Sequence, residues 1–174
     1  MLVERVQRHN RKRESREEEL LRLRNKVMDR FNSLEPQYSY NMAIREELPE
    51  DGIACFGITQ LGFAAWFGFP TYKPRTLIHP GYQGTLGYAF PTALGAQVGN
   101  PDKKVVAISG DGGFMFNVQE LATAAQHNIG VVTIVMNDGA FGNVKRNQKE
   151  DYGERYLGVD LQNPDFMKLA DAFG

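Results

Sequence analysis

One short segment constrains the fold of this chain more than any other. Residues 105–109 read Val-Val-Ala-Ile-Ser and are apolar until the last position, which is typical of a strand covered on both faces in a parallel sheet. The segment runs directly into Gly110-Asp111-Gly112-Gly113. These four residues are therefore expected at the carboxyl end of a parallel strand, where doubly wound sheets bind their ligands.

Other apolar runs extend this pattern along the chain. Residues 53–56 and 131–136 predict two further strands, and residues 76–78 predict a weaker one. Helices are expected to begin at Ser39, Pro91, Asn117 and the pair Asn163-Pro164. Strands that alternate with helices predict right-handed crossovers, and hence an α/β fold: a three-layer sandwich with a mainly parallel sheet flanked by helices. The last helix reaches Gly174 without a following strand, so we expect the domain to be truncated at its C-terminus.

The first 35 residues differ in composition from the rest. Residues 1–26 hold nine Lys or Arg and five Glu, and Ser15 with Glu18 forms a possible capping box. An apolar stripe follows at Leu20, Val27, Phe31 and Leu34. We expect a charged linker with an amphipathic helix over residues 1–35, docked on a neighbouring domain, and a folded domain over residues 36–174. A basic nucleic-acid arm is the alternative, but the interspersed glutamates weaken its field.

Bulk composition excludes several classes of protein. The net charge is −1, so the molecule as a whole presents no electrostatic case for binding nucleic acid. The single cysteine, Cys55, excludes an internal disulfide framework and fits a reducing cytoplasm. No run of eighteen apolar residues is present, so no membrane span is expected. We therefore expect a cytoplasmic protein.

The acid within the glycine-rich turn indicates a metal ion. Glycines let successive backbone N–H groups approach a phosphate, but Asp111 among them would repel a diphosphate unless a cation lay between. Mg²⁺ takes carboxylate, carbonyl and phosphate oxygens together. A second predicted strand ends in Asn137-Asp138-Gly139-Ala140, and Asp111 and Asp138 could reach one ion if the two strands are neighbours. Taken singly, each motif could be a simple turn.

Together these motifs resemble a known signature. Gly110-Asp111-Gly112, then twenty-four residues, then Asn137-Asp138 is similar to the signature of thiamine-diphosphate-dependent enzymes, in which Gly-Asp-Gly precedes Asn-Asn at about that distance. Residues 84–91, Gly-Thr-Leu-Gly-Tyr-Ala-Phe-Pro, match the same family upstream. The resemblance covers roughly residues 36–174. It looks closest to the acetolactate synthase, benzoylformate decarboxylase and pyruvate decarboxylase group, in the domain that binds the cofactor's diphosphate.

The resemblance implies a set of cofactor contacts. Asp111, the side chain of Asp138 and the main-chain carbonyl of Ala140 would bind Mg²⁺. The carbonyl of Gly84 would accept a hydrogen bond from the aminopyrimidine, and Leu86 would lie beneath the bend of the cofactor, unless it is a plain core leucine. The remaining implied contacts of thiamine diphosphate are Thr59, Gln60, Thr85, Gly110, Gly112, Gly113, Phe141, Gly142 and Asn143. Asn143 would also touch the substrate.

The resemblance also implies an activity and a missing partner. The cofactor carries the carbanion chemistry, and the protein supplies position and electrostatics, in decarboxylation of a small 2-oxo acid or carboligation. Family enzymes need a glutamate from a pyrimidine-binding domain, usually of a partner subunit. We therefore expect this chain to be inactive alone and to belong to a homo-oligomeric enzyme, a dimer or tetramer. A non-catalytic binding module or a split subunit is the alternative. A P-loop nucleotide binder is disfavoured, because no Gly-Lys-Ser/Thr follows the glycines.

Two positions depart from the family pattern. Asp138 replaces the commoner asparagine, which adds a negative charge beside the diphosphate. Gly57 stands where many relatives have an acid at the end of the first strand, so contacts at that point are in doubt.

Overall fold

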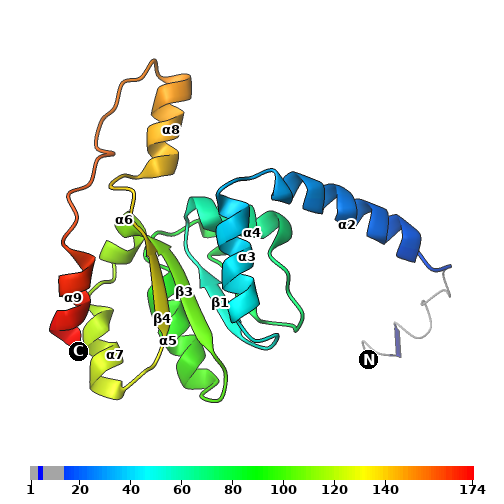
Figure 1. Ribbon diagram of the computed structural model, residues 1–174, viewed down its shortest axis with the longest axis horizontal. Coiled ribbons are helices and arrows are strands. Elements are labelled where there is room, and N and C mark those ends of the chain that lie inside the picture. The colour runs from blue at the N-terminus through cyan, green and yellow to red at the C-terminus, as the bar shows by residue number, and fades with distance from the viewer. Residues whose placement is uncertain (1–3, 6–13) are drawn as a thin grey trace.

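The computed structural model describes residues 4–5 and 14–174. Much of the expected N-terminal charged linker, residues 1–3 and 6–13, lies outside the described residues. The described elements, in chain order, are the following (Figure 1). They are α2 (Glu17–Asn32), α3 (Gln37–Glu47), β1 (Ile53–Phe56), α4 (Gln60–Gly68), β2 (Leu77–Ile78), η1 (Gly81–Gln83), α5 (Ala89–Gly99), β3 (Val105–Gly110), α6 (Asp111–Met115), α7 (Glu120–His127), β4 (Val132–Met136), α8 (Gly142–Asp151) and α9 (Phe166–Phe173).

The four strands form one sheet in the order β2-β1-β3-β4, and every neighbouring pair is parallel. The predicted α/β fold with a parallel sheet is confirmed, and no strand boundary differs from the expected one by more than a single residue. In the register of β3 and β4, Gly110 lies opposite Met136. The loops that follow these two strands therefore leave the sheet side by side.

Helices cover both faces of the sheet and make the sandwich three layers thick. One core cluster joins Ile53, Cys55 and Val105 to Phe90 and Leu94 of α5, with partly buried residues of α7 and α9 packed against it. The second joins strand residues to Leu61 and Ala65 of α4, with Ile44 of α3 alongside. Alternate residues of β1 and β3 contribute to opposite clusters, because successive side chains of a strand point to opposite faces.

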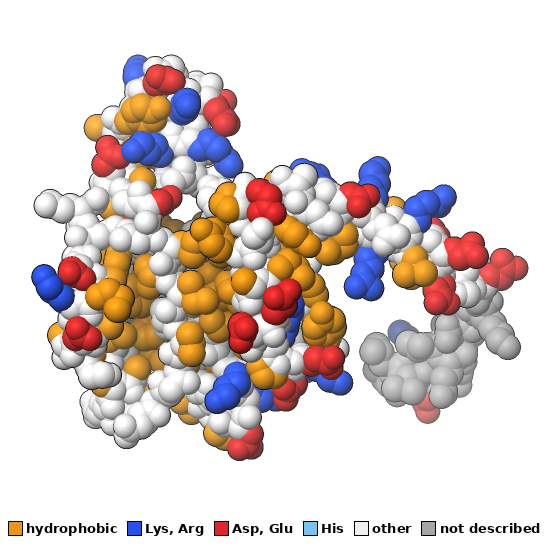
Figure 2. Space-filling view, viewed as in Figure 1, with side chains coloured by type: hydrophobic (Ala, Val, Ile, Leu, Met, Phe, Trp, Pro, Cys, Tyr) orange, Lys and Arg blue, Asp and Glu red, His pale blue; other side chains and the backbone are white. Residues whose placement is uncertain are grey.

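Helix α2 extends away from the sheet (Figure 1). Its last turn is attached through Phe31, which is fully buried and lies against Gly68 at the end of α4. The other stripe residues, Leu20 and Val27, are exposed, and the projecting helix α2 carries charged side chains (Figure 2). Docking of this stripe on a neighbouring domain stays a prediction.

Two predicted helix starts are wrong. Ser39 lies inside α3, where its Oγ is 2.8 Å from the carboxylate of Glu35. Asn117 precedes α7 by three residues, and its Nδ2 donates to the carbonyl of Gly87 at 2.6 Å. A polar side chain that can cap a helix can also bond to other partners. In the fold, Ser39 and Asn117 each form a hydrogen bond other than the expected cap.

The two outermost predicted caps are also shifted. Helix α2 begins at Glu17, and no side-chain cap bond forms at its N-cap, Arg16. Ser15 instead accepts from the backbone N–H of Glu17 at 3.3 Å. Helix α9 is capped by Asp165, whose side chain accepts from Met167 and Lys168 N–H, so Asn163 is free for a different role.

No helix in the described ranges 4–5 and 14–174 is both long and apolar enough to cross a membrane.

Candidate functional site

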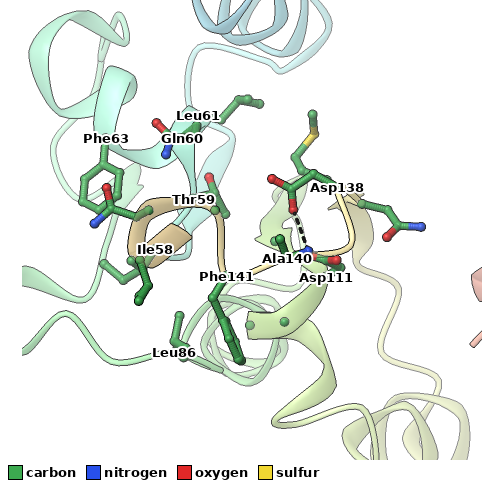
Figure 3. A pocket seen from close by; sticks show the side chains of 18 of the residues that line it. Ile58, Thr59, Gln60, Leu61, Phe63, Leu86, Asp111, Asp138, Ala140 and Phe141 are labelled. Atoms are coloured by element: carbon green, nitrogen blue, oxygen red, sulfur yellow. Dashed lines mark hydrogen bonds between the residues drawn. The ribbon is translucent and has the colours of Figure 1, made fainter. Parts of the chain in front are cut away.

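A cavity of about 450 Å³ opens at the carboxyl edge of the sheet. It lies where the loops after β1, β3 and β4 converge, next to the 84–86 loop (Figure 3). With the exception of Thr85, every predicted site residue lines it: Thr59, Gln60, Gly84, Leu86, Gly110, Asp111, Gly112, Gly113, Asp138, Ala140, Phe141, Gly142 and Asn143. The fold thus assembles one site from residues far apart in sequence.

Asp111 lies at the junction of β3 and α6 and is only 2% exposed. Its Oδ2 accepts two hydrogen bonds, from Gly139 N at 2.8 Å and from Asn163 Nδ2 at 2.6 Å. A buried carboxylate needs such donors, because loss of its hydration is costly. The carboxylate is therefore held in one orientation by the loop after β4 and by the segment before α9.

Asp138 follows β4 and faces Asp111 across the site (Figure 3). Partial burial raises the pKa of the Asp138 carboxyl, and the negative charge of Asp111 raises it further. The Asp138 carboxylate lies close to the backbone at residue 142, and this is possible because that residue is glycine. A Cβ there would lie 2.9 Å from Asp138 Oδ2. Two carboxylates that repel each other in one pocket form a donor pair suited to a hard divalent cation.

Ala140 adds a neutral oxygen beside these carboxylates. It forms an isolated antiparallel bridge with Asp160, but the two hydrogen bonds of that bridge are made by neighbours, from Phe141 N to Val159 O and from Leu161 N to Gly139 O, each at 2.8 Å. The bridge therefore fixes the loop without using the carbonyl of Ala140. The donor set of two carboxylates and one carbonyl oxygen fits Mg²⁺.

Within residues 4–5 and 14–174, no group of three or more His, Cys, Asp or Glu side chains is placed to hold a metal ion. A site with two carboxylates leaves further positions to carbonyl, water or phosphate oxygens, which is the usual arrangement for Mg²⁺.

Gly112 and Gly113 lie in the first turn of α6, where backbone N–H groups lack a carbonyl partner within the helix. A Cβ at Gly112 would lie 2.6 Å from the Phe141 ring and 2.9 Å from the Leu161 side chain. The absence of a side chain lets the loop after β4 pack directly on this turn. The turn can therefore present N–H donors to an anion in the cavity.

Thr59 and Gln60 reach the cavity from the loop after β1. Thr59 is the N-cap of α4, and its Oγ1 accepts from Gly62 N at 2.9 Å. This role was not predicted, since the sequence pattern there did not indicate a helix. The side chain of Thr59 is thus oriented by α4, while its position beside Gly110 places it at the cavity.

The 84–86 loop forms another wall of the cavity, where Leu86 lies (Figure 3). Gly84 has φ +57°, a left-handed conformation that favours glycine, and ends the turn η1. Leu86 is half-buried and lies beside the cavity near Phe141 and Gly113. Thr85 is exposed and outside the cavity lining, so its side chain is not brought to the site.

Asn143 lies in the first turn of α8 and lines the cavity, and its Oδ1 accepts from Arg146 at 2.7 Å. Helix α8 and the segment that follows it project beyond the end of the sheet (Figure 1). Asn143 thus lines the cavity from the first turn of this projecting helix.

Several lining residues were not predicted from the sequence. Ile58, Leu61 and Phe63 line the wall near α4, and Pro36, Gln37 and Tyr40 approach from α3. Asn163 also contacts the site, through Asp111. No local pattern marks these residues, because an apolar or amide side chain carries no indication of which loop it will meet.

Comparison with known proteins assigns the chain to a family. A family model described as "Thiamine pyrophosphate enzyme, C-terminal TPP binding domain" matches residues 57–174. The chain belongs to this family. It carries the thiamine-pyrophosphate-binding domain found in acetolactate synthases and related decarboxylases, as the resemblance in the sequence indicated.

Individual relatives agree with this assignment. The chain is 50% identical over 101 residues to the mitochondrial acetolactate synthase catalytic subunit of Aspergillus candidus, covering 58% of this chain and 15% of that protein. It is 39% identical over 146 residues to the acetolactate synthase large subunit of Corynebacterium glutamicum, covering 81% and 23%. A thiamine-diphosphate-dependent 4-hydroxybenzoylformate decarboxylase of Rhodococcus jostii superposes with a TM-score of 0.71 at 30% identity, covering 78% and 26%. The chain thus spans about a quarter or less of these relatives.

Proposed function

We propose that this chain binds the diphosphate of thiamine diphosphate through Mg²⁺. Asp111, Asp138 and the main-chain carbonyl of Ala140 hold the metal, and the N–H groups of Gly112 and Gly113 meet the diphosphate. The observation that carries the proposal is the meeting of two carboxylates at the ends of adjacent parallel strands, beside the first turn of α6. A diphosphate could approach these carboxylates only with a cation between them.

The other walls of the cavity suit the organic part of the cofactor. The carbonyl of Gly84 would accept from the aminopyrimidine amine, and Leu86 would support the bend of the molecule from below. Thr59 and Gln60 would add contacts to the diphosphate, and Asn143 would face the substrate at the mouth of the cavity. When bound, the cofactor supplies a carbon nucleophile and an electron sink for cleavage of a 2-oxo acid.

We further propose that the domain works within a 2-oxo-acid decarboxylase or carboligase of the acetolactate synthase type. The names of its relatives support this. A pyrimidine-binding domain, from the same enzyme or from a partner subunit, would complete the site in a homo-oligomer. The substrate would be a small 2-oxo acid.

The metal-dependent binding can be tested by calorimetry. Thiamine diphosphate titrated into the wild-type chain should give heat with Mg²⁺ and little without it, because the two carboxylates repel the diphosphate. Asp111→Ala should abolish the Mg²⁺-dependent heat. Asp102→Ala is the matched control, since it removes an exposed acid before β3, at the other end of that strand, and should bind as the wild type does. Equal heats from the wild type and Asp111→Ala would refute the proposal.

The proposal that a pyrimidine-binding domain completes the site makes a separate prediction about activity. The chain alone, saturated with thiamine diphosphate and Mg²⁺, should release CO₂ from pyruvate no faster than a blank without protein. The proposed reason is that the proton relay of the cofactor needs a glutamate from the pyrimidine-binding domain. Turnover above the blank, in a preparation shown by mass spectrometry to hold this chain only, would contradict it.

A further inference from the structure

Asn163 makes an unusual pair of contacts for a residue expected to start a helix. It lies before α9, on the segment that returns from α8, and its Nδ2 is 2.6 Å from Asp111 Oδ2 and 2.9 Å from Asn137 Oδ1. A side-chain amide nitrogen carries two N–H groups, so each can be directed to one of these acceptors. One amide therefore links the residue that follows β3 to the residue that follows β4.

The effect on Asp111 is specific. Asn163 and Gly139 both donate to Oδ2, which anchors the carboxylate through one oxygen, fixes its plane and leaves the other oxygen for a cation. Because Asp111 is 2% exposed, water cannot easily replace a lost donor. Removal of the amide would free the carboxylate to turn and would leave it less stabilised.

Asn163 is not needed to hold its own segment in place. Leu161 N donates to Gly139 O at 2.8 Å and Phe141 N to Val159 O at 2.8 Å. Lys145 pairs with Asp160 at 2.6 Å, on the same returning segment. These contacts secure the segment independently, so the distinctive contribution of Asn163 is at the carboxylate of Asp111.

We propose that Asn163 is a positioning residue for the divalent cation: it orients Asp111 and couples it to Asn137 without touching the ion itself. This inference rests on the proposed function of the cavity. Residues that orient a metal ligand typically change metal affinity by about ten- to a hundredfold when they are replaced.

The test is a titration of Mg²⁺ at fixed, saturating thiamine diphosphate, with binding followed by calorimetry. Asn163→Ala should raise the Mg²⁺ concentration at half-saturation by about tenfold or more. Excess Mg²⁺ should return the thiamine diphosphate affinity of Asn163→Ala to within about twofold of the wild type, a rescue that a damaged fold would not show.

Asp165→Ala is the matched control, since it removes the cap of α9 two residues away without touching Asp111. It should lower the melting temperature and leave the Mg²⁺ midpoint unchanged. If Asn163→Ala is too unstable to titrate, Asn163→Ser takes its place, since its shorter side chain also loses the bridge.

The outcomes separate the two proposals. Wild-type chain that binds without any dependence on Mg²⁺ overturns the proposed function and the role of Asn163 with it. Mg²⁺-dependent binding in the wild type, with the same midpoint in the Asn163 variants, overturns the role of Asn163 alone. An equal rise in midpoint in Asp165→Ala also overturns it, because the effect would then come from general loosening of the segment.

Discussion

Asp138 is the residue at which this site departs from the thiamine-diphosphate signature, which commonly has asparagine there. Its carboxyl faces that of Asp111, and both burial and that neighbouring charge raise its pKa. The second negative charge should attract a divalent cation more strongly, and it should also repel a diphosphate more strongly when no cation is bound. Under the proposed function, this balance would make diphosphate binding depend more strictly on a metal ion than at a site with one carboxylate.

Asp138→Asn tests this balance. We expect Mg²⁺ affinity to fall by about tenfold, equivalent to ~1.4 kcal/mol, because one of two carboxylate ligands becomes a neutral amide. Binding of thiamine diphosphate without metal should become stronger at the same time. Both quantities can be measured by calorimetry beside Asp102→Asn, which changes charge by the same amount away from the cavity. A variant with unaltered metal dependence would show that Asp138 does not share the ion.

At the scale of elements, the junction of β1 and α4 positions one wall of the cavity. Helix α4 starts immediately after Thr59, and residue 62 packs on the backbone of the preceding loop. A Cβ at Gly62 would lie 2.3 Å from the carbonyl oxygen of Gly57. Neither atom is the end of a flexible side chain, so the start of α4 would have to move.

Gly62→Ala should therefore lower the free energy of unfolding by roughly 1–3 kcal/mol, despite the better helix propensity of alanine. Gly95→Ala is the control, since Gly95 lies in α5 and a methyl group added there would meet no atom within 4 Å; it should gain up to about 1 kcal/mol. Urea unfolding of both variants measures the difference. Equal stability of the two variants would mean that α4 and the loop after β1 are not tightly coupled.

The strands were predictable from sequence, whereas the helix starts expected at Ser39 and Asn117 were wrong. An apolar run such as residues 105–109 has one good environment, a sheet buried on both faces, and the structure places it there. Ser39 and Asn117 each suited a helix cap, but the partners nearest to them in the fold were Glu35 and Gly87. Short polar side chains have many acceptable partners, so sequence could not select among them.

At the scale of the whole molecule, Cys55 reports on the integrity of the sheet. It lies in the middle of β1, is fully buried, and its burial raises the pKa of the thiol to about 12. The thiolate is the reactive form. Native Cys55 is therefore unreactive toward alkylating reagents for two reasons: the reagent cannot reach the buried sulfur, and the thiol stays protonated.

We expect a thiol-alkylating reagent at pH 8 to label Cys55 on the order of a thousandfold or more slowly in native buffer than in denaturant. Labelling would require opening of the domain, since the thiol is fully buried within the core cluster that joins β1 and β3 to α5. Mass spectrometry over time gives the rate, and Gly62→Ala should label faster, by about tenfold for each 1.4 kcal/mol of lost stability. Rapid labelling of the native wild type would show that β1 opens locally.

Sequence by itself determined the parallel α/β architecture and the two motifs that end β3 and β4. It could do so because apolar runs and glycine-flanked acids restrict the backbone over a few adjacent residues. Only the tertiary structure decided that Asn163 reaches Asp111 and that Ile58 and Tyr40 line the cavity. Asn163 and Asp111 are 52 positions apart, and contacts over such separations depend on how layers pack rather than on any local pattern.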